Sequence, residues 1–379
     1  MCNGDASEQY AEHHNQQYLV AVMCREEGRA SGFLLSSRLS PSHFPLFIVT
    51  CILLLNACNA PPQNDSAEIT GETMGSTFAV IIPELTQTGD RAEVEKKINL
   101  ILDEINQSMS TYIPESELSR INTSDSTDWI SISPQLYEVL AAAQDVSQMT
   151  NGAFDITVGA LVNLWGFGPE PGNQEIPDAS AVGDALQWVG YQNIELQAYP
   201  AAVKKRYART YLDLSGIASG YAADRIAGLL DSKNITNYMV DISGEIRARG
   251  KSGQNQTWRI GIEKPLVDRR SVQTVVALDN TGLTTAGDYR NFFEFEGKRY
   301  SHTIDPATGW PVSHNLASVT VLDDSAMYAD ALDTAMMVMG PELAYKFAEA
   351  EKISALFIIR QGEEFIQKVT SPLASSLVE

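Results

Sequence analysis

Two segments in the first half of the chain repeat apolar residues every three or four positions, the spacing of an amphipathic helix. The first begins near Asp90, with Glu93 three residues later as in a capping box. Its apolar face would consist of Val94, Ile98, Ile101, Leu102, Ile105 and Met109. The second begins at Ser133-Pro134 and ends at Asn151-Gly152, which places Pro at the first helical position and Gly after the last. Both patterns predict helices packed on a core.

The second half of the chain changes to runs rich in β-branched and aromatic residues, which are typical of strands. Such runs occupy residues 257–263, 272–278, 292–304 and 317–322, the third with a hairpin turn at Glu296-Gly297. Helical patterns at 216–231, 328–339 and 342–350 alternate with them. Hairpins occur at positions where a doubly wound sheet would need crossover helices. The chain also has neither a Walker A sequence nor a G-x-G-x-x-G motif after a strand, which argues against a standard nucleotide-binding fold. The order predicts an α+β fold with a mixed, largely antiparallel sheet and flanking helices.

An apolar run from Phe44 to Cys58 stands near the beginning of the chain, with arginines upstream of it. It is too short to span a membrane comfortably and is typical of a secretory signal with a cleavage site. Its last residues, Leu55-Asn56-Ala57-Cys58, resemble a bacterial lipobox, in which the cysteine becomes the lipidated first residue, although Asn56 stands where a small or β-branched residue is usual. We expect a lipid anchor at Cys58; a plain cleaved signal and an uncleaved anchor are the alternatives.

These features divide the chain into an export segment and a folded domain. Residues 1–57 are expected to form the signal/lipoprotein export segment, of which residues 1–22 are not translated if Met23 is the true start. Residues 58–68 form a linker, and residues 69–379 form the folded domain, long enough for one large unit or two closely packed ones.

Composition narrows the chemistry of that domain. All four cysteines lie at or before Cys58, so the domain has no disulfide framework and no cysteine chemistry. Only His302 and His314 remain of the five histidines, which argues against a zinc hydrolase. From Cys58 onward, 24 Lys and Arg face 43 Asp and Glu, and this acidity disfavours nucleic acid as a partner. A phosphate-containing substrate would therefore have to be attracted by a metal ion or by helix N-termini.

Ionisable and hydroxyl groups concentrate between residues 300 and 340. His302 lies beside a turn bounded by Pro and Gly, while Asp330 and Thr334 stand one helical turn apart on the same face. A hard cation such as Mg²⁺ prefers oxygen ligands and usually takes one or two carboxylates together with substrate phosphate oxygens. The alternative is that Asp330 caps or opens a helix while Thr334 faces solvent or binds a carbonyl.

Two earlier segments combine glycines with a lone acid. In residues 211–230, small residues stand at the start of a predicted helix. They would let a phosphate approach free backbone N–H groups, or they would only allow close helix packing. Asp213, which precedes them, is either a ligand contact or a turn acid. Residues 150–169 combine Asp155 with aromatic residues, which suits either a cover over a flat ring or packing of Phe154 and Trp165 in the core.

Several blocks, taken in order, resemble the ApbE-type FAD:protein FMN transferases, or flavin transferases, over about residues 69–370. They are MGSTF, MSTY, GAFDITVGALVNLWGFGP, DLSGIASGYAAD, the VDISGEI strand, TTAGDYRN, SHTIDPATGWPV and ADALDTAMMVMG. The resemblance implies an ApbE-like (T-fold-like) architecture and a flavin transferase catalytic domain at 69–379. It further implies an enzyme that, with Mg²⁺, transfers the FMN half of FAD through a phosphoester bond to a Thr or Ser hydroxyl of an acceptor protein and releases AMP.

Matched block by block, the resemblance also implies roles for single residues. The implied FAD contacts are Met74, Tyr112, the turn Ala153-Phe154-Asp155, Asp213, Ser219 and Ile304. The implied ligands of Mg²⁺ are the carbonyl of Gly216 and the side chains of Asp330 and Thr334, with Asp333 as a further contact. His302 becomes the candidate base or phosphate-orienting group, with a structural histidine as the alternative. Ser219 departs from the family pattern, which usually has a longer Lys or Glu there.

The resemblance extends to partners and location. It implies an acceptor protein with a Ser/Thr flavinylation motif, typically a subunit of a membrane redox pump, and an exported enzyme on the periplasmic side, lipid-anchored to the inner membrane. Two other functions would use the same binding residues. One is a metal-dependent FAD pyrophosphatase with water as the acceptor, and the other is a periplasmic flavin-binding lipoprotein without turnover.

Overall fold

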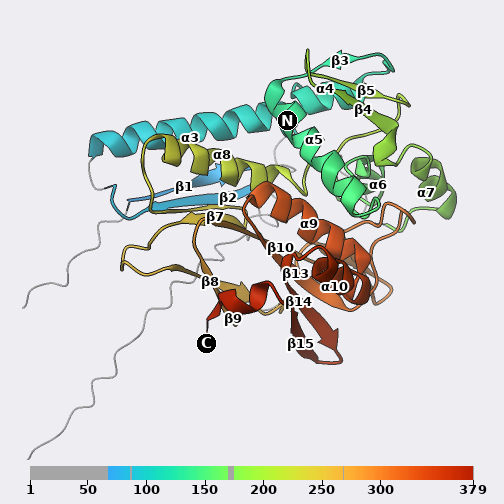
Figure 1. Ribbon diagram of the computed structural model, residues 1–379. Coiled ribbons are helices and arrows are strands. Elements are labelled where there is room, and N and C mark those ends of the chain that lie inside the picture. Colours follow the sequence, from blue (N-terminus) through green and yellow to red (C-terminus); the bar gives the residue numbers. More distant parts are fainter. Residues whose placement is uncertain (1–66, 86–87, 170–174, 268, 379) are drawn as a thin grey trace, which may run out of the picture.

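The computed structural model describes residues 67–85, 88–169, 175–267 and 269–378 (Figure 1). The expected export segment, the lipid anchor at Cys58 and nearly all of the expected linker lie outside the described residues. Over the described ranges, none of the helices has both the length and the apolar composition that a membrane crossing requires.

A large antiparallel sheet is the centre of the fold. Within the described residues its eight strands run in the order β1-β2-β6-β7-β10-β13-β14-β15, and every neighbouring pair is antiparallel. The strands are β1 Ala67–Thr73, β2 Ser76–Ile82, β6 Tyr238–Ile242, β7 Glu245–Arg249, β10 Thr281–Gly287, β13 Leu316–Asp323, β14 Ser354–Gln361 and β15 Glu364–Val369. Together with the helices below, this sheet confirms the predicted α+β class.

The two faces of the sheet are covered differently (Figure 1). Helices cover one face and enclose the main core: α3 Thr88–Met109, α5 Pro134–Met149, α8 Ala218–Ser232, α9 Ala326–Met339 and α10 Pro341–Ala350. A small sheet of β8 Trp258–Glu263, β9 Val272–Leu278 and β16 Leu377–Val378 covers the other face. Trp258 and Leu278 pack there against Ile246 of the large sheet. The apolar residues therefore fill two layers, one on each side of the sheet.

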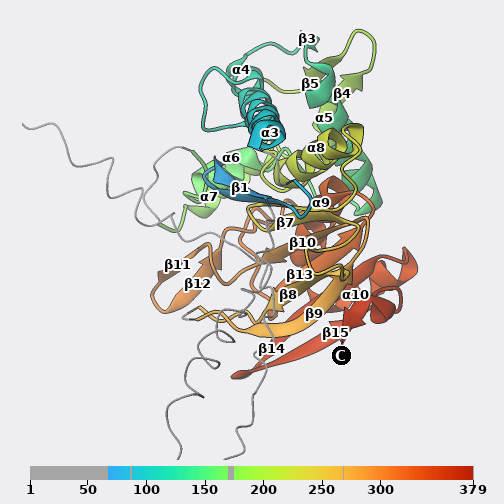
Figure 2. The ribbon, with the colours of Figure 1, turned by 90° about the vertical axis from the view of Figure 1, so that its left-hand side faces the viewer.

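Shorter elements surround this body. One group lies beside α5 and consists of α4 Glu117–Thr123, β3 Ile130–Ser131, β4 Ile194–Gln197, β5 Ala202–Lys205 and the 3-10 turn η2 Tyr191–Asn193. The 3-10 turn η3 Leu373–Ser376 precedes β16. A second group combines α6 Gly159–Leu164 and α7 Ala179–Leu186 with the hairpin β11 Phe292–Phe295 and β12 Lys298–Ser301, which projects beside them (Figure 2). An aromatic cluster around Trp165, Phe293 and Tyr300 holds this second group together.

Local signals explain where most predicted elements begin and end. Ser133 caps α5 by accepting a hydrogen bond from the backbone N–H of Leu136 at 3.2 Å, as predicted, and Asn151 and Gly152 end it with φ angles of 57° and 81°. The predicted hairpin at Glu296-Gly297 also forms.

Four expectations about boundaries were wrong, one of them the start of α8, which begins at Ala218, two residues later than predicted. The helix α3 begins at Thr88, so Asp90 lies in its first turn and does not cap it. The helix α9 begins at Ala326, two residues earlier than predicted, because Ser325 caps it through the N–H of Tyr328. The VDISGEI block is not one strand, since β6 and β7 are joined there by a turn at Ser243-Gly244 with φ angles of 62° and 109°.

Candidate functional site

The start of α8 meets the middle of α9 at the centre of the helical layer. The backbone N–H of Gly220 donates a hydrogen bond to Oδ2 of Asp330 at 3.0 Å. A Cβ on Gly220 would stand 2.3 Å from the carbonyl oxygen of Ala326, so only glycine allows the two helices to approach this closely. Close packing, the alternative considered for the glycines of this segment, is therefore the reason for Gly220. The N–H of Gly220 is used in the hydrogen bond to the Asp330 carboxylate and is therefore not the phosphate-binding group considered above.

A second contact joins the turn before α8 to the next turn of α9. A Cβ built on Gly216 would lie 3.0 Å from Oγ1 of Thr334 and 3.4 Å from the ring of Phe154. Asp330 and Thr334 share a face of α9 because they are four residues apart. The structure thus brings three of the four predicted metal-binding residues, Gly216, Asp330 and Thr334, to one place. Asp330 is the fifth residue of α9, so it does not cap that helix.

The fourth residue, Asp333, is buried next to them and accepts a hydrogen bond from the Thr334 hydroxyl at 3.4 Å. Burial raises the pKa of Asp330 to about 7, although the N–H of Gly220 partly opposes the shift. Burial, followed by repulsion from Asp330, raises the pKa of Asp333 well above its usual range. Two carboxylates are thus held in an apolar layer where their charge is poorly compensated.

A third carboxylate, Glu245 at the start of β7, belongs to the same group and was missed in the sequence. Burial, then repulsion from Asp330 and Asp333, raises its pKa well above the usual range. Its Oε2 atom is buried and has no hydrogen-bond partner within the part of the chain that the structure describes. The only sequence signal was an acid directly after the Ser243-Gly244 turn, and a turn acid is too common to stand out.

This arrangement fits a divalent cation with oxygen ligands. The desolvated carboxylates need a positive charge, and the absence of a side chain at Gly216 leaves room beside Thr334 Oγ1. Among the described residues, no three His, Cys, Asp or Glu side chains converge so as to hold a metal by themselves. A cation here would therefore depend on a hydroxyl and a backbone carbonyl as well as on carboxylates, which is the mixed set expected for Mg²⁺.

Four of the residues implied as FAD contacts gather around the start of α8. Ser219 Oγ donates to Sδ of Met74 at 3.7 Å, and Met74 occupies the tight turn between β1 and β2 with φ 52°. Phe154 is buried against Gly216. Oδ1 of Asp213 accepts from the N–H and the hydroxyl of Ser215 at 2.8 and 2.5 Å, so this carboxylate holds the turn before α8. The short serine at 219 thus still reaches the Met74 turn.

The four other implied contacts have different surroundings. Asp155 is buried, and its carboxylate accepts from the N–H and hydroxyl of Thr157 and from the N–H of Tyr191, so it ties two loops together. Ile304 packs into the aromatic cluster around Trp165. Tyr112 is 64% exposed on the loop after α3. Ala153 is packed at the edge of the main core, directly before Phe154. The alternative that Phe154 and Trp165 are core residues is consistent with their burial at 4% and 0% exposure.

His302 is half-buried directly after β12, and one of its ring nitrogens is committed. Its Nδ1 lies 3.0 Å from the carbonyl oxygen of Asn291, which can only accept, so Nδ1 carries the proton and Nε2 of the neutral ring is a free base. Burial lowers the pKa of His302, which keeps the ring neutral at pH values where a typical histidine is partly charged. The geometry therefore suits a general base.

Both ring nitrogens of His314 form hydrogen bonds with the backbone. Its Nε2 donates to the carbonyl of Met337 at 2.8 Å, and its Nδ1 accepts from the N–H of Leu316 at 3.3 Å. With both ring nitrogens used by the backbone, His314 has a structural role in joining α9 to β13.

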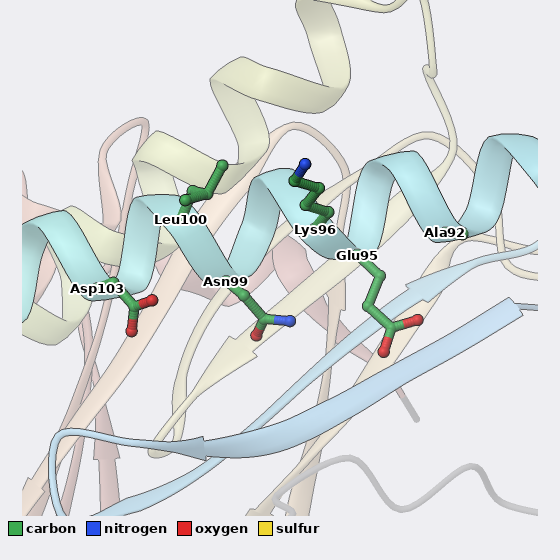
Figure 3. Close-up of a pocket in the computed structure, with 6 residues that line it drawn as sticks. All are labelled: Ala92, Glu95, Lys96, Asn99, Leu100 and Asp103. Carbon is green, nitrogen blue, oxygen red and sulfur yellow. The ribbon is translucent and has the colours of Figure 1, made fainter.

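A hollow of about 420 Å³ along α3 does not compete with this site (Figure 3). Its lining residues all come from one helix, and Glu95, Asn99 and Asp103 point away from Lys96 and Leu100. Binding sites need polar groups that converge, and here they diverge.

The fold and the site define a class: an antiparallel α+β protein in which buried carboxylates, a hydroxyl group and a glycine turn meet between two helices on the sheet. The family model described as the ApbE family matches residues 74–357. The FAD:protein FMN transferase of Vibrio cholerae is 40% identical over 326 residues, covering 86% of this chain and 96% of that protein. The FAD:protein FMN transferase of Escherichia coli K12 is 37% identical over 339 residues, with 87% and 96% covered.

A solved structure, the flavin transferase ApbE from Vibrio cholerae, superposes with a TM-score of 0.76 at 39% identity, over 82% of this chain and 99% of that one. Since the family model spans well over half of the chain, the chain belongs to the ApbE family. This confirms the resemblance that the motif blocks indicated.

Proposed function

We propose that this protein is an FAD:protein FMN transferase that acts with Mg²⁺ and releases AMP. The observation that carries the proposal is the meeting of Gly216, Asp330 and Thr334 between α8 and α9, in a chain whose family relatives carry that name. The site supplies oxygen ligands but few positive charges, so a cation is needed before two phosphates can bind there.

The reaction balances as a phosphoryl transfer. The oxygen of a Ser or Thr hydroxyl on the acceptor protein attacks the phosphorus on the FMN side of the FAD pyrophosphate. The bond from that phosphorus to the bridging oxygen breaks, and AMP leaves with the electron pair. A hydroxyl is a poor nucleophile at neutral pH, so the proton needs a base, and Nε2 of His302 is suited to take it because Nδ1 is held by Asn291.

The residues of the chain divide this work. Asp330, Thr334 and the carbonyl of Gly216 would hold the cation, with Asp333 as a further contact. When bound, Mg²⁺ supplies positive charge to the phosphate oxygens and to the leaving group. Four of the proposed FAD contacts surround the start of α8, namely Met74, Ser219, Phe154 and Asp213. The other four proposed contacts are Tyr112, Ala153, Asp155 and Ile304.

The proposal is tested by incubating the purified protein with FAD, Mg²⁺ and a Thr-containing acceptor fragment, and following AMP and the mass of the acceptor. A mass gain of one FMN together with AMP is the expected result. AMP without a modified acceptor would indicate an FAD pyrophosphatase, and binding of FAD without either product would indicate a flavin-binding protein. In the natural setting we propose a Ser/Thr-containing subunit of a membrane redox pump as the acceptor.

We also propose that the protein is exported and anchored by a lipid at Cys58, on the periplasmic side of the inner membrane. The support is the sequence from Phe44 to Cys58, with its apolar run and its lipobox-like end. Labelled palmitate should appear in the wild-type protein expressed in a bacterial host, and the Cys58→Ala variant should lose the label. Labelling that persists in this variant would contradict the anchor.

A further inference from the structure

A second hollow, of about 460 Å³, lies between the loop after β12 and the last turn of α9. We name it the Trp310 hollow; its lining includes Asp305, Trp310, Pro311, Val312 and Val338. Its volume lies within the roughly 300–1,000 Å³ that is usual for binding pockets. None of the residues assigned above to FAD or to the cation lines it.

The hollow adjoins both halves of the proposed chemistry. Val338 follows Thr334 by four residues, so it lies on the same face of α9, about 6 Å further along the helix axis. On the opposite wall, the N–H of Val312 donates to the carbonyl of Thr303 at 3.0 Å, next to His302. The hollow thus lies one helical turn from the proposed metal ligand Thr334 and adjoins the backbone segment that carries His302.

The residues around the start of α8 occupy the other direction along α9. Gly220 packs against Ala326 and bonds to Asp330, and Gly216 packs against Thr334. The proposed flavin contacts Met74 and Phe154 belong to this side. Thr334 thus stands between these contacts and the hollow, while Ile304, another proposed FAD contact, lies on the hollow's side, where its backbone pairs with Pro311. Because Ile304 does not line the hollow, the hollow remains open to the second substrate.

The wall is rigid and mixed in character. The ring of Trp310 is 37% exposed and packs edge-on against Trp165 at 5.1 Å between ring centroids. Trp165 is fixed in turn by donating its Nε1–H to the carbonyl of Gly309 at 2.9 Å. Pro311, Val312 and Val338 add apolar surface, while Asp305 adds a carboxylate that holds its own turn through Ala307 and Thr308. Such a wall suits an extended peptide segment with an apolar side chain.

We propose that the Trp310 hollow binds the segment of the acceptor protein that carries the reactive Ser or Thr. An apolar residue next to the hydroxyl residue packs on Trp310 and Val338, and the hydroxyl reaches the space between His302 and Thr334. The inference rests on the proposed function, because only a transferase needs a place for a polypeptide acceptor.

The test uses a library of displayed random peptides that share a fixed central threonine. Peptides are selected for binding to the full-length protein in the presence of FAD and Mg²⁺. Selected peptides should carry an apolar residue beside the threonine. Their affinity should fall by about tenfold or more in Trp310→Ala and in Val338→Gln, since truncating a central aromatic contact has an effect of this size. Trp129→Ala, a change at a 45% exposed tryptophan beside β3, is the matched control and should leave peptide affinity unchanged. The affinity for FAD should stay constant in all variants.

Three outcomes would overturn the inference. Selection on the wild-type protein could enrich no peptide beyond the level found with the Trp310→Ala protein, the selected peptides could bind all variants equally, or the affinity for FAD could fall together with the affinity for the peptide. The second substitution protects the test from misfolding, because Val338→Gln leaves the contact between Trp310 and Trp165 intact. The mass of the selected peptides separates the two proposals. A peptide that depends on Trp310 and Val338 for binding but gains no FMN would contradict the transferase and, with it, the role of the hollow as the acceptor site, whereas a modified peptide that binds all variants equally would overturn the hollow alone.

Discussion

The backbone N–H of Gly220 donates to the carboxylate of Asp330, and this bond joins residues 110 positions apart. It fixes the proposed metal ligand in one orientation before any cation binds. A glycine that is needed for helix packing therefore also positions the site, so packing and function depend on the same residue.

Replacing Gly220 by alanine should destabilise the protein and disturb the site together. The new Cβ would stand 2.3 Å from the Ala326 carbonyl oxygen, and overpacking of this kind costs roughly 1–3 kcal/mol. Gly228 on the same helix has open space around it, so Gly228→Ala is the matched control and should stabilise by about 0.5–1 kcal/mol. Urea unfolding of both variants checks this, and equal effects of the same sign would contradict the packing argument.

Replacing Asp330 by asparagine should remove Mg²⁺-dependent turnover while the domain stays folded. The amide oxygen can still accept from Gly220, but it no longer offers a charged ligand, so we expect AMP release to fall by at least about 100-fold. Because a poorly compensated buried charge is lost, the melting temperature of the metal-free protein should not decrease. Turnover at the wild-type rate in this variant would exclude Asp330 as a ligand.

The sequence could predict this part of the site because the relevant spacing is local. Asp330 and Thr334 lie four residues apart on one helix, and a helix puts such residues on one face in any fold. Likewise, Ser133 caps α5 through a neighbour three residues away. Family blocks added Gly216, which no local rule would have joined to Thr334.

What escaped prediction depends on contacts between distant elements. Glu245 becomes part of the carboxylate group only because β7 lies beneath α9, and no spacing within the VDISGEI block announces this. The commitment of the Gly220 N–H to Asp330 needs the packing of α8 on α9. The Asp90 and Glu93 pattern failed for a different reason, since α3 begins at Thr88, two residues before the residue that the pattern takes as the cap.

The metal-free protein should lose stability as the pH rises from about 5 to about 8. The pKa of Asp330 is raised to about 7 in the folded state, so the folded state binds protons more tightly than the unfolded state above pH 3.8. Stability from this group is thus greatest at low pH and is lost as the pH approaches 7, and Asp333 and Glu245 act in the same direction. Each kcal/mol lost lowers the melting temperature by roughly 2 °C.

Thermal unfolding in a chelator, with and without added Mg²⁺, measures this effect. Mg²⁺ should raise the melting temperature more at pH 8 than at pH 5, because protons and the cation compete for the same carboxylates. Asp330→Asn should flatten the pH dependence of the metal-free protein. A wild-type melting temperature that rises over this range in chelator would contradict the raised carboxylate pKa values.

Replacing His302 should slow transfer far more than it weakens FAD binding. Its Nδ1–H is held by the Asn291 carbonyl, so Nε2 is the free base, and loss of a positioned base costs about 100-fold to 10,000-fold in rate. Because burial lowers the pKa of His302, the rate at saturating Mg²⁺ should begin to drop at a lower pH than a typical histidine base would give. His302→Ala and His302→Gln should both lose this acid limb. Flavin fluorescence measures FAD affinity, and acceptor mass measures transfer. A defect confined to affinity would make His302 a binding residue and not a base.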